Sequence, residues 1–177
     1  MPLNKQPNAE LFIGDFPMPP SWNQAKTVAR YGRQIVNTKA ANDFEKECKV
    51  WAKKRAPHLQ ELRLTAKEIC AGGYMSVSFW FCFPREKLLT LDGSPKTIDV
   101  SNRIKMLEDR LAEVIEVDDK FFQLESCEKL FHSGAQSFVV IRLRSSPILS
   151  LKERIEVSGF EKMLSGLLPP GCGLGPH

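Results

Sequence analysis

The stretch of sequence from Lys96 to Asp119 concentrates the side chains that are able to perform chemistry. It begins with Asp99, carries Lys105 in its middle and ends with the pair Asp118 and Asp119. Carboxylates without histidine or cysteine among them favour a hard cation, and Mg²⁺ fits such oxygen ligands. A divalent ion polarises a phosphoryl oxygen and orients hydroxide, while a nearby lysine neutralises charge developing on the phosphate. These residue types therefore suggest phosphodiester hydrolysis.

The same stretch has the periodicity of an amphipathic helix, which we predict over residues 99–116. Its apolar residues recur at helical spacing and form a core face, which consists of Val100, Ile104, Leu107, Leu111, Val114 and Ile115. On the opposite side lie Asn102, Lys105 and Asp109, at positions i, i+3 and i+7. This polar face alone is equally typical of a solvated helix surface, and Asp99 is also a routine helix cap.

A shared metal site requires Asp119 to approach Asp99. An α-helix rises about 1.5 Å per residue, so the two ends of the predicted helix lie well over about 20 Å apart. The approach is feasible if the strand after Asp119 runs back beside the helix, or if a second subunit completes the site. Converged carboxylates repel each other, so a cation must hold them together.

The remaining elements predict a mixed α/β (α+β) fold with the order βαβαββ. We expect about four strands in one mixed sheet, two main helices and a short C-terminal helix. The strands are expected at residues 11–16, 74–83, 120–131 and 136–143, and the first helix at residues 38–56, ended by Pro57. His132, Ser133 and Gly134 suit a hairpin turn between the last two strands. We expect a domain at residues 1–144 and an extension at 145–177 whose short helix starts near Ser158.

Composition excludes several classes of protein. The chain has 177 residues, and 25 Lys and Arg against 21 Asp and Glu give a net charge of +4, which permits nucleic-acid binding without demanding it. No run approaches the roughly 18 apolar residues of a membrane span, and the first ten residues lack a signal peptide's apolar run. Five widely spaced cysteines without zinc-ligand spacing suggest reduced thiols in a cytoplasmic protein.

Several motifs, taken in order, resemble the RusA-like family of Holliday junction resolvases. That family carries a helix-opening motif Asp-x-Asp-Asn-x-x-Lys, an Asp on the same helix, and then an Asp-Asp pair. Here the motif runs from Asp99 through Asn102 to Lys105, followed by Asp109 and by Asp118-Asp119. The run Pro19-Pro20-Ser21-Trp22-Asn23 resembles the family's Pro-Pro-Ser-x-Asn signature, and the similarity spans residues 11–143.

The resemblance implies a homodimeric, Mg²⁺-dependent endonuclease that cuts four-way DNA junctions by paired, symmetric nicks. Asp99 and Asp119 match metal-binding carboxylates, and Lys105 matches the catalytic lysine. Asp118 is an alternative or additional metal ligand, because the Asp-Asp pair allows a slip of one residue. Ser101, Asn102 and Asp109 are expected to support the site.

Ser101 departs from the family pattern, which has a second Asp at this position. A hydroxyl is a weaker Mg²⁺ ligand than a carboxylate. The site therefore has one charge fewer, or Asp118 or Asp109 compensates, or activity is lost. The alternative function is accordingly a weakened or inactive protein of the same fold that binds branched DNA.

A branched DNA substrate calls for cations that contact phosphates. The candidates are basic residues near the proposed site or in the early basic segment: Lys26, Arg30, Arg33, Lys96, Arg103 and Arg110. Each is also compatible with an ordinary solvated surface. Trp22, which follows two prolines, can stack at a junction opening or pack on the sheet edge.

Overall fold

The computed structural model of the protein describes residues 10–28, 35–71 and 73–147. The chain divides into two units, Met1–Ser146 and Pro147–His177, and the first unit contains every element described below. The helix expected after Ser158 lies outside the described residues.

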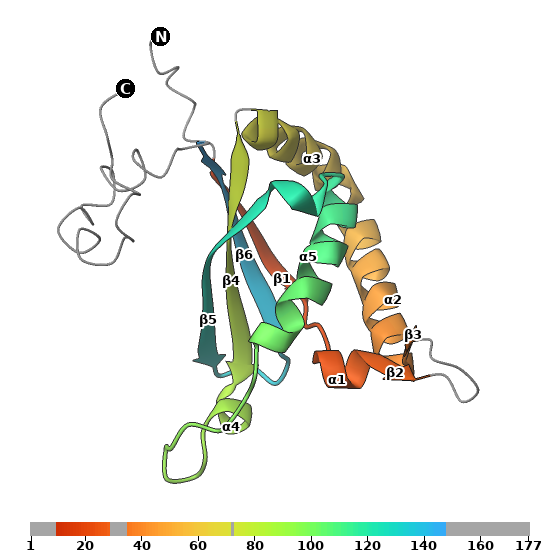
Figure 1. Ribbon diagram of the computed structural model, residues 1–177. Helices are drawn as coiled ribbons and strands as arrows, with labels where there is room; N and C mark the ends of the chain where they lie inside the picture. Colours follow the sequence, from red (N-terminus) through yellow and green to blue (C-terminus); the bar gives the residue numbers. More distant parts are fainter. Residues whose placement is uncertain (1–9, 29–34, 72, 148–177) are drawn as a thin grey trace, which may run out of the picture. The chain divides into compact units, whose positions relative to one another are not determined.

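One mixed sheet forms the centre of this unit, as the sequence predicted (Figure 1). Its strands are β1 (Glu10–Pro17), β4 (Tyr74–Pro84), β5 (Phe122–His132) and β6 (Phe138–Ser146), in the order β1-β6-β4-β5. Strand β4 runs parallel to β5 and antiparallel to β6, and β1 pairs antiparallel with β6. Strands β1 and β5 therefore form the two edges.

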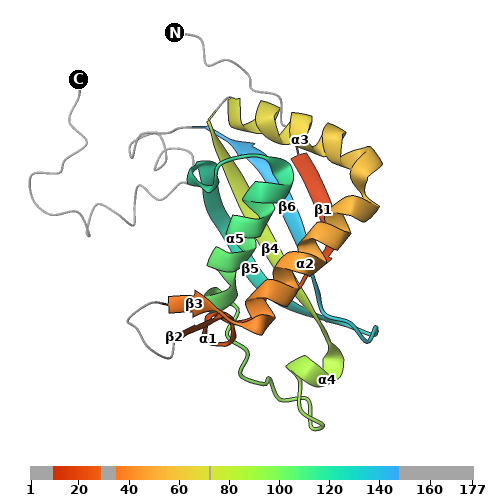
Figure 2. The same ribbon diagram turned by 90° about the vertical axis from the view of Figure 1, so that its right-hand side faces the viewer.

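Three helices cover one face of the sheet (Figure 2): α2 (Lys39–Lys54), α3 (Ala56–Ala71) and α5 (Ser101–Ile115). The shorter elements are α1 (Trp22–Ala25), the paired strands β2 (Lys26–Val28) and β3 (Ile35–Asn37), α4 (Arg85–Leu88) and the 3₁₀ turn η1 (Asp119–Phe121). The described unit thus has a sheet layer and a helix layer, and α5 lies in the helix layer.

Helix α2 begins where its sequence predicted. The Thr38 hydroxyl accepts a hydrogen bond from the Ala41 backbone N–H at 3.4 Å, which satisfies one of the free donors of the first turn. One face of α2 is buried against the sheet, and it consists of Ala41, Phe44, Cys48 and Trp51. The helix ends at Lys54.

Helix α3 was missed by the sequence analysis, which took Pro57 as the end of helical structure. Pro57 is instead the second residue of α3. In the first turn of a helix the backbone N–H groups have no acceptor within the helix, so a proline there costs no helical hydrogen bond. Leu59, Ala66 and Ile69 form the buried face of this helix. The prediction of two main helices is therefore corrected to three.

The predicted hairpin between the last two strands is also wrong. Both strands form, but β4 lies between β5 and β6, so the segment at His132-Ser133-Gly134 connects strands that are not neighbours. The reason lies in β4, whose side chains are buried almost throughout, including the hydroxyls of Ser76 and Ser78. A strand that is buried on both faces takes a central place, whereas the largely exposed β5 takes an edge.

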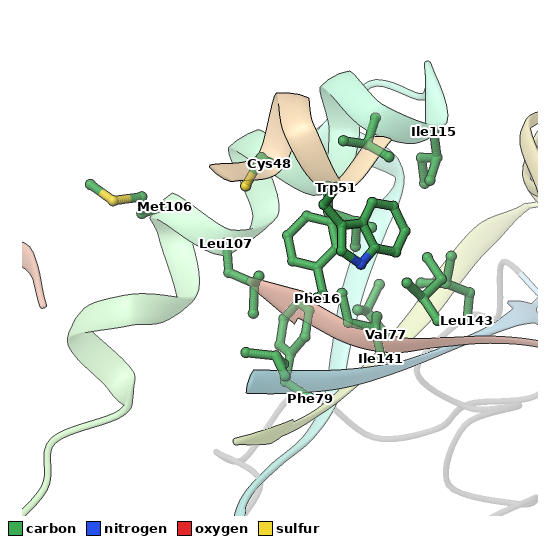
Figure 3. Packing of buried hydrophobic residues seen from close by; sticks show 14 of the residues in the cluster. Phe16, Cys48, Trp51, Val77, Phe79, Met106, Leu107, Ile115, Ile141 and Leu143 are labelled. Atoms are coloured by element: carbon green, nitrogen blue, oxygen red, sulfur yellow. The ribbon is translucent and has the colours of Figure 1, made fainter. Parts of the chain in front are cut away.

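The hydrophobic core lies between the sheet and the three helices (Figure 3). Phe16 from β1 packs against Trp51 of α2 with ring centroids 5.0 Å apart. Phe79 of β4 and Leu107 of α5 are fully buried in the same cluster. Truncation of a buried phenylalanine such as Phe79 lowers the free energy of unfolding by about 3–5 kcal/mol. Packing against this core therefore holds α5 on the sheet.

The four cysteines in the described part of the chain are free thiols, as predicted. Cys48 and Cys82 are buried, and burial raises the pKa of the Cys48 thiol to about 12. In the described ranges, no helix combines the length and apolar character that a bilayer span requires.

Candidate active site

Helix α5 carries most of the predicted site residues on its exposed side. Its buried side contains Leu107, Leu111, Val114 and Ile115, with Ile104 and Val100 partly buried against the same core, as the periodicity predicted. Met106 is buried as well, although the sequence analysis did not include it. Asn102, Lys105 and Asp109 are exposed along the opposite side of the helix.

Asp99 precedes the first turn of α5 and caps it. Its Oδ1 accepts hydrogen bonds from the backbone N–H of Ser101 at 3.0 Å and of Asn102 at 3.4 Å. The Ser101 hydroxyl donates to the same oxygen at 2.5 Å, and the Asn102 side-chain amide donates to Oδ2. The hydroxyl of Ser101, followed by these other donors, lowers the pKa of the Asp99 carboxyl. Asp99 is therefore ionised at neutral pH.

Lys105 lies one helical turn beyond Asn102 and contacts two carboxylates. Its ammonium is 2.9 Å from Asp109 Oδ1 and forms an even closer ion pair with Asp119. The hydrogen bond with Asp119, followed by that with Asp109, raises the pKa of Lys105 above its ordinary value. Lys105 thus stays positively charged throughout the physiological range.

The chain reverses sharply after α5, and this reversal brings Asp119 back to Lys105. Glu116 adopts a left-handed conformation (φ 56°), and the backbone N–H of Val117 still bonds to the Ala112 carbonyl at 3.1 Å. The side chain of Glu116 pairs with Arg63 and Lys67 of α3, at 2.7 and 3.2 Å. These two ion pairs tie the end of α5 to α3 at the point where the backbone turns.

Asp118 starts the turn η1 and leads into β5. Its carboxylate accepts from the Lys120 backbone N–H at 3.0 Å and pairs with the Lys120 ammonium at 2.8 Å, which lowers its pKa. Strand β5 then runs back towards the segment that precedes α5, where the Lys129 ammonium donates to the Ile98 carbonyl at 3.1 Å. The strand after Asp119 therefore brings the chain back to the residue that precedes Asp99, whereas Asp119 itself contacts Lys105. The approach of Asp119 to Asp99 stays a prediction.

The predicted residues gather in two groups along α5. Asp99, Ser101 and Asn102 form one group, and Lys105, Asp109 and Asp119 form the other. Asn102 and Lys105 are one helical turn apart, so the two groups are adjacent on one side of the helix. In the described ranges, no three Asp, Glu, His or Cys side chains come close enough to hold an ion by themselves.

Glu108 is a residue of this region that sequence reasoning missed. It is half-buried on α5, three residues after Lys105. Burial raises the pKa of the Glu108 carboxyl, Lys105 opposes this effect, and Asp119 and Asp109 add to it. Its position three residues after Lys105 was the only feature that placed Glu108 near the site. The sequence does not distinguish a half-buried glutamate from an exposed one.

Two of the predicted DNA-binding cations, Lys96 and Arg103, line a wide hollow of about 830 Å³ next to Ile98. The Lys96 ammonium donates to the Glu86 carbonyl at 2.7 Å. Arg103 donates from Nη1 to the carbonyl of Pro19, so it joins the Pro-Pro loop to α5. Both cations therefore lie beside the Asp99 end of the helix.

The other predicted cations have different surroundings. Arg110 pairs with Glu113 at 2.7 Å and with Glu45 at 3.6 Å, so its charge is already compensated. Lys26 lies over the ring of Trp22, 5.4 Å from its centroid. Arg30 and Arg33 lie outside the described residues.

The family model for the endodeoxyribonuclease RusA matches residues 17–144, which is most of the chain. This family match defines an endodeoxyribonuclease. The chain belongs to the RusA family of Holliday junction resolvases, as its motifs predicted, and so to a family of metal-dependent nucleases that act on branched DNA. No curated protein matches the chain.

Proposed function

We propose that this enzyme resolves four-way DNA junctions by Mg²⁺-dependent, symmetric nicking, with Asp99, Lys105 and Asp119 at the centre of its site. The observation that carries the proposal is the charged cluster on the exposed side of α5, in which Lys105 pairs with Asp109 of the same helix and with Asp119 of η1. Ser101, Asn102 and Asp109 support these residues. A cytoplasmic location, where DNA and Mg²⁺ are both available, belongs to the same proposal.

The available ligands fit Mg²⁺. Asp99 and Asp118 have lowered pKa values and are therefore ionised at neutral pH, and the donor set consists of oxygen atoms. Mg²⁺ in proteins is commonly held by one or two carboxylates, with waters and substrate phosphate completing its shell. We propose Asp99 and Asp119 as these carboxylates, with Asp118 as the alternative. These residues would hold the ion, which would supply Lewis-acid chemistry for phosphodiester hydrolysis.

Lys105 supplies a fixed positive charge to the scissile phosphate. Its ammonium is bound to two carboxylates and remains protonated, so it stabilises the negative charge that grows in the transition state. When a phosphate arrives, Lys105 exchanges one carboxylate contact for a phosphate oxygen. Asp109 keeps the other contact and holds the ammonium in place.

The hollow beside Asp99 offers a path for the DNA backbone. Lys87, Lys96 and Arg103 line it together with Glu47 and Glu86. In the described part of the chain, none of these three cations forms an ion pair with a carboxylate. Within residues 10–28, 35–71 and 73–147, the ammonium groups of Lys87 and Lys96 contact neutral oxygens, namely the Ser137 hydroxyl at 3.4 Å and the Glu86 carbonyl at 2.7 Å. Their charges are therefore available to phosphates.

Symmetric nicking needs two active sites, because one chain supplies a single set of Asp99, Lys105 and Asp119. A homodimer places two such sets on two strands of a four-way junction. Light scattering of the purified protein is expected to give the mass of two chains, and a purely monomeric protein contradicts this part of the proposal.

A nicking assay tests the proposal. Wild-type protein with labelled four-way junctions is expected to give paired nicks with Mg²⁺, none in EDTA, and little cleavage of linear duplex. Asp119→Asn and Lys105→Ala are expected to abolish cleavage. Asp43→Asn is the matched control, because Asp43 is another lysine-paired and exposed carboxylate on a helix, outside the site. Undiminished cleavage by both site variants rules out this active site.

Ser101 favours one alternative, a protein that binds junctions with weak or no cleavage. The Ser101 hydroxyl donates to Asp99, and a family-type aspartate at this position has no proton to donate when ionised. This alternative predicts junction binding in EDTA and no product at any Mg²⁺ concentration. Recovery of cleavage in Ser101→Asp establishes it.

A further inference from the structure

Trp22 is a large aromatic side chain that the fold holds at the surface. The residue is 43% exposed, although burial of an indole normally stabilises a protein. It belongs to α1, the single helical turn that follows Pro19 and Pro20. The position of this turn therefore decides what the exposed ring can reach.

Several contacts fix α1 on the body of the domain. Ala25, its last residue, is fully buried, and the Ala25 carbonyl accepts from the Thr38 backbone N–H at 2.9 Å. The Thr38 hydroxyl donates to the Gln24 carbonyl at 2.5 Å, and the Ser21 backbone N–H donates to the Gln24 side chain at 3.2 Å. This turn is thus rigidly attached, and Trp22 projects from a fixed base.

Helix α1 is also joined to α5, the helix that carries Lys105. Helix α1 packs against α5, near the end at which α5 begins (Figure 1). Arg103 of α5 bonds to the Pro19 carbonyl, three residues before Trp22. The neighbour of Arg103 in sequence is Asn102, whose amide bonds to Asp99. A short series of direct contacts therefore connects the base of Trp22 to the proposed metal-binding carboxylate.

Lys26 completes the local arrangement. Its ammonium lies 5.4 Å from the centroid of the Trp22 ring and donates to the Asn37 side chain at 2.6 Å. The position of the charge is thus set by β3, and the charge lies over the exposed ring. An aromatic surface next to a fixed cation is the combination that binds a nucleobase together with its phosphate.

We propose that Trp22 stacks on an unpaired or unstacked nucleobase at the branch point of the DNA, with Lys26 contacting an adjacent phosphate. This inference rests on the proposed function and adds to it the residue that distinguishes branched from linear DNA. In a linear duplex both faces of each internal base are covered by neighbouring bases. At a branch point the stack is interrupted, and a base face is available to the indole.

Binding measurements in EDTA test the inference with a four-way junction and a linear duplex of the same arm sequence. Stacking on an aromatic side chain contributes enough that Trp22→Ala is expected to weaken junction binding by about 5- to 100-fold. Its affinity for linear duplex is expected to be unchanged. Trp22→Phe and Trp22→Tyr keep an aromatic ring and are expected to stay within about threefold of wild type. Phe12→Ala is the control, because Phe12 is also an exposed aromatic residue (57%) but lies on strand β1.

The outcomes separate the inference from the proposed function. If wild type nicks junctions with Mg²⁺ while Trp22→Ala binds them as tightly as wild type, only the stacking role fails. An equal loss of affinity for junction and duplex, no rescue by Phe or Tyr, or a changed oligomeric mass of Trp22→Ala also overturns it. If wild type neither binds nor nicks junctions, the proposed function fails, and the stacking role fails with it.

Discussion

The Lys105 ammonium forms an ion pair with Asp119, fourteen residues later, and lies 2.9 Å from Asp109 on its own helix. The contact with Asp119 depends on the backbone reversal at Glu116, whereas the contact with Asp109 follows from helical spacing. This relationship joins the middle of the predicted motif to its end.

Lys105→Ala is expected to lower the junction cleavage rate by at least about 10²-fold, because the site loses the charge that stabilises the transition state. The pair is well exposed, so stability is expected to change by less than about 1 kcal/mol. Single-turnover cleavage and thermal unfolding measure the two effects. Lys105→Arg keeps the charge and is expected to retain part of the activity, whereas equal rates for the Ala and wild-type proteins contradict the assignment.

Ser101→Ala is expected to raise the pKa of the Asp99 carboxyl towards its ordinary value, because the Ser101 hydroxyl is the largest cause of its lowering. In the folded protein this pKa lies below the unfolded value. The capping interaction therefore stabilises the fold above the unfolded pKa and is lost as the pH falls through the folded pKa. NMR titration of the Asp99 carboxyl carbon measures the shift. An unchanged titration curve in Ser101→Ala shows that the hydroxyl bond is not formed in solution.

Glu108→Gln is expected to stabilise the protein at neutral pH and to have little effect near pH 3. Burial raises the folded pKa of Glu108, so the ionised side chain destabilises the fold as the pH rises through the unfolded and then the folded pKa. Urea unfolding at the two pH values tests this expectation. Glu61→Gln, at an exposed position of α3, is the control. A stabilisation of equal size at both pH values argues against an ionisation effect.

Arg103→Met is expected to destabilise the protein by about 1–3 kcal/mol, because the Pro19 carbonyl loses its donor while the aliphatic packing is kept. Chemical denaturation measures this change. Arg85→Met, which alters an exposed arginine of α4, is expected to have an effect within about 0.5 kcal/mol. Equal stabilities of the Arg103 and Arg85 variants contradict a structural role for the Arg103 contact.

Local patterns predicted the elements that form regular helices and strands. Helices α2 and α5 have apolar residues at helical spacing, and β4 is an aromatic run bounded by Gly73 and Pro84, so each was located correctly. Helix α3 was missed because Pro57 ends one helix in most contexts but is tolerated in the first turn of another. The residues around Pro57 do not show whether it ends one helix or stands in the first turn of the next.

Relationships between distant segments were harder to predict. The last two strands were located, but the placement of β4 between them depends on burial across the whole sheet. In the site, the contact of Asp99 with Asn102 and that of Lys105 with Asp109 follow from local spacing. The contact between Lys105 and Asp119 requires the left-handed Glu116 and its ion pairs with α3, a helix that the sequence analysis did not expect.

The pairing of β1 with β6 has a consequence for how the protein is made. Glu10 lies opposite Arg144, so the first and last strands of the sheet are neighbours although more than a hundred residues separate them. During synthesis on the ribosome, β1 emerges long before its partner and must wait, unpaired, until β6 has left the exit tunnel. Nascent chains that stop before residue 138 lack β6 altogether. They are expected to expose open strand edges and to aggregate or be captured by chaperones.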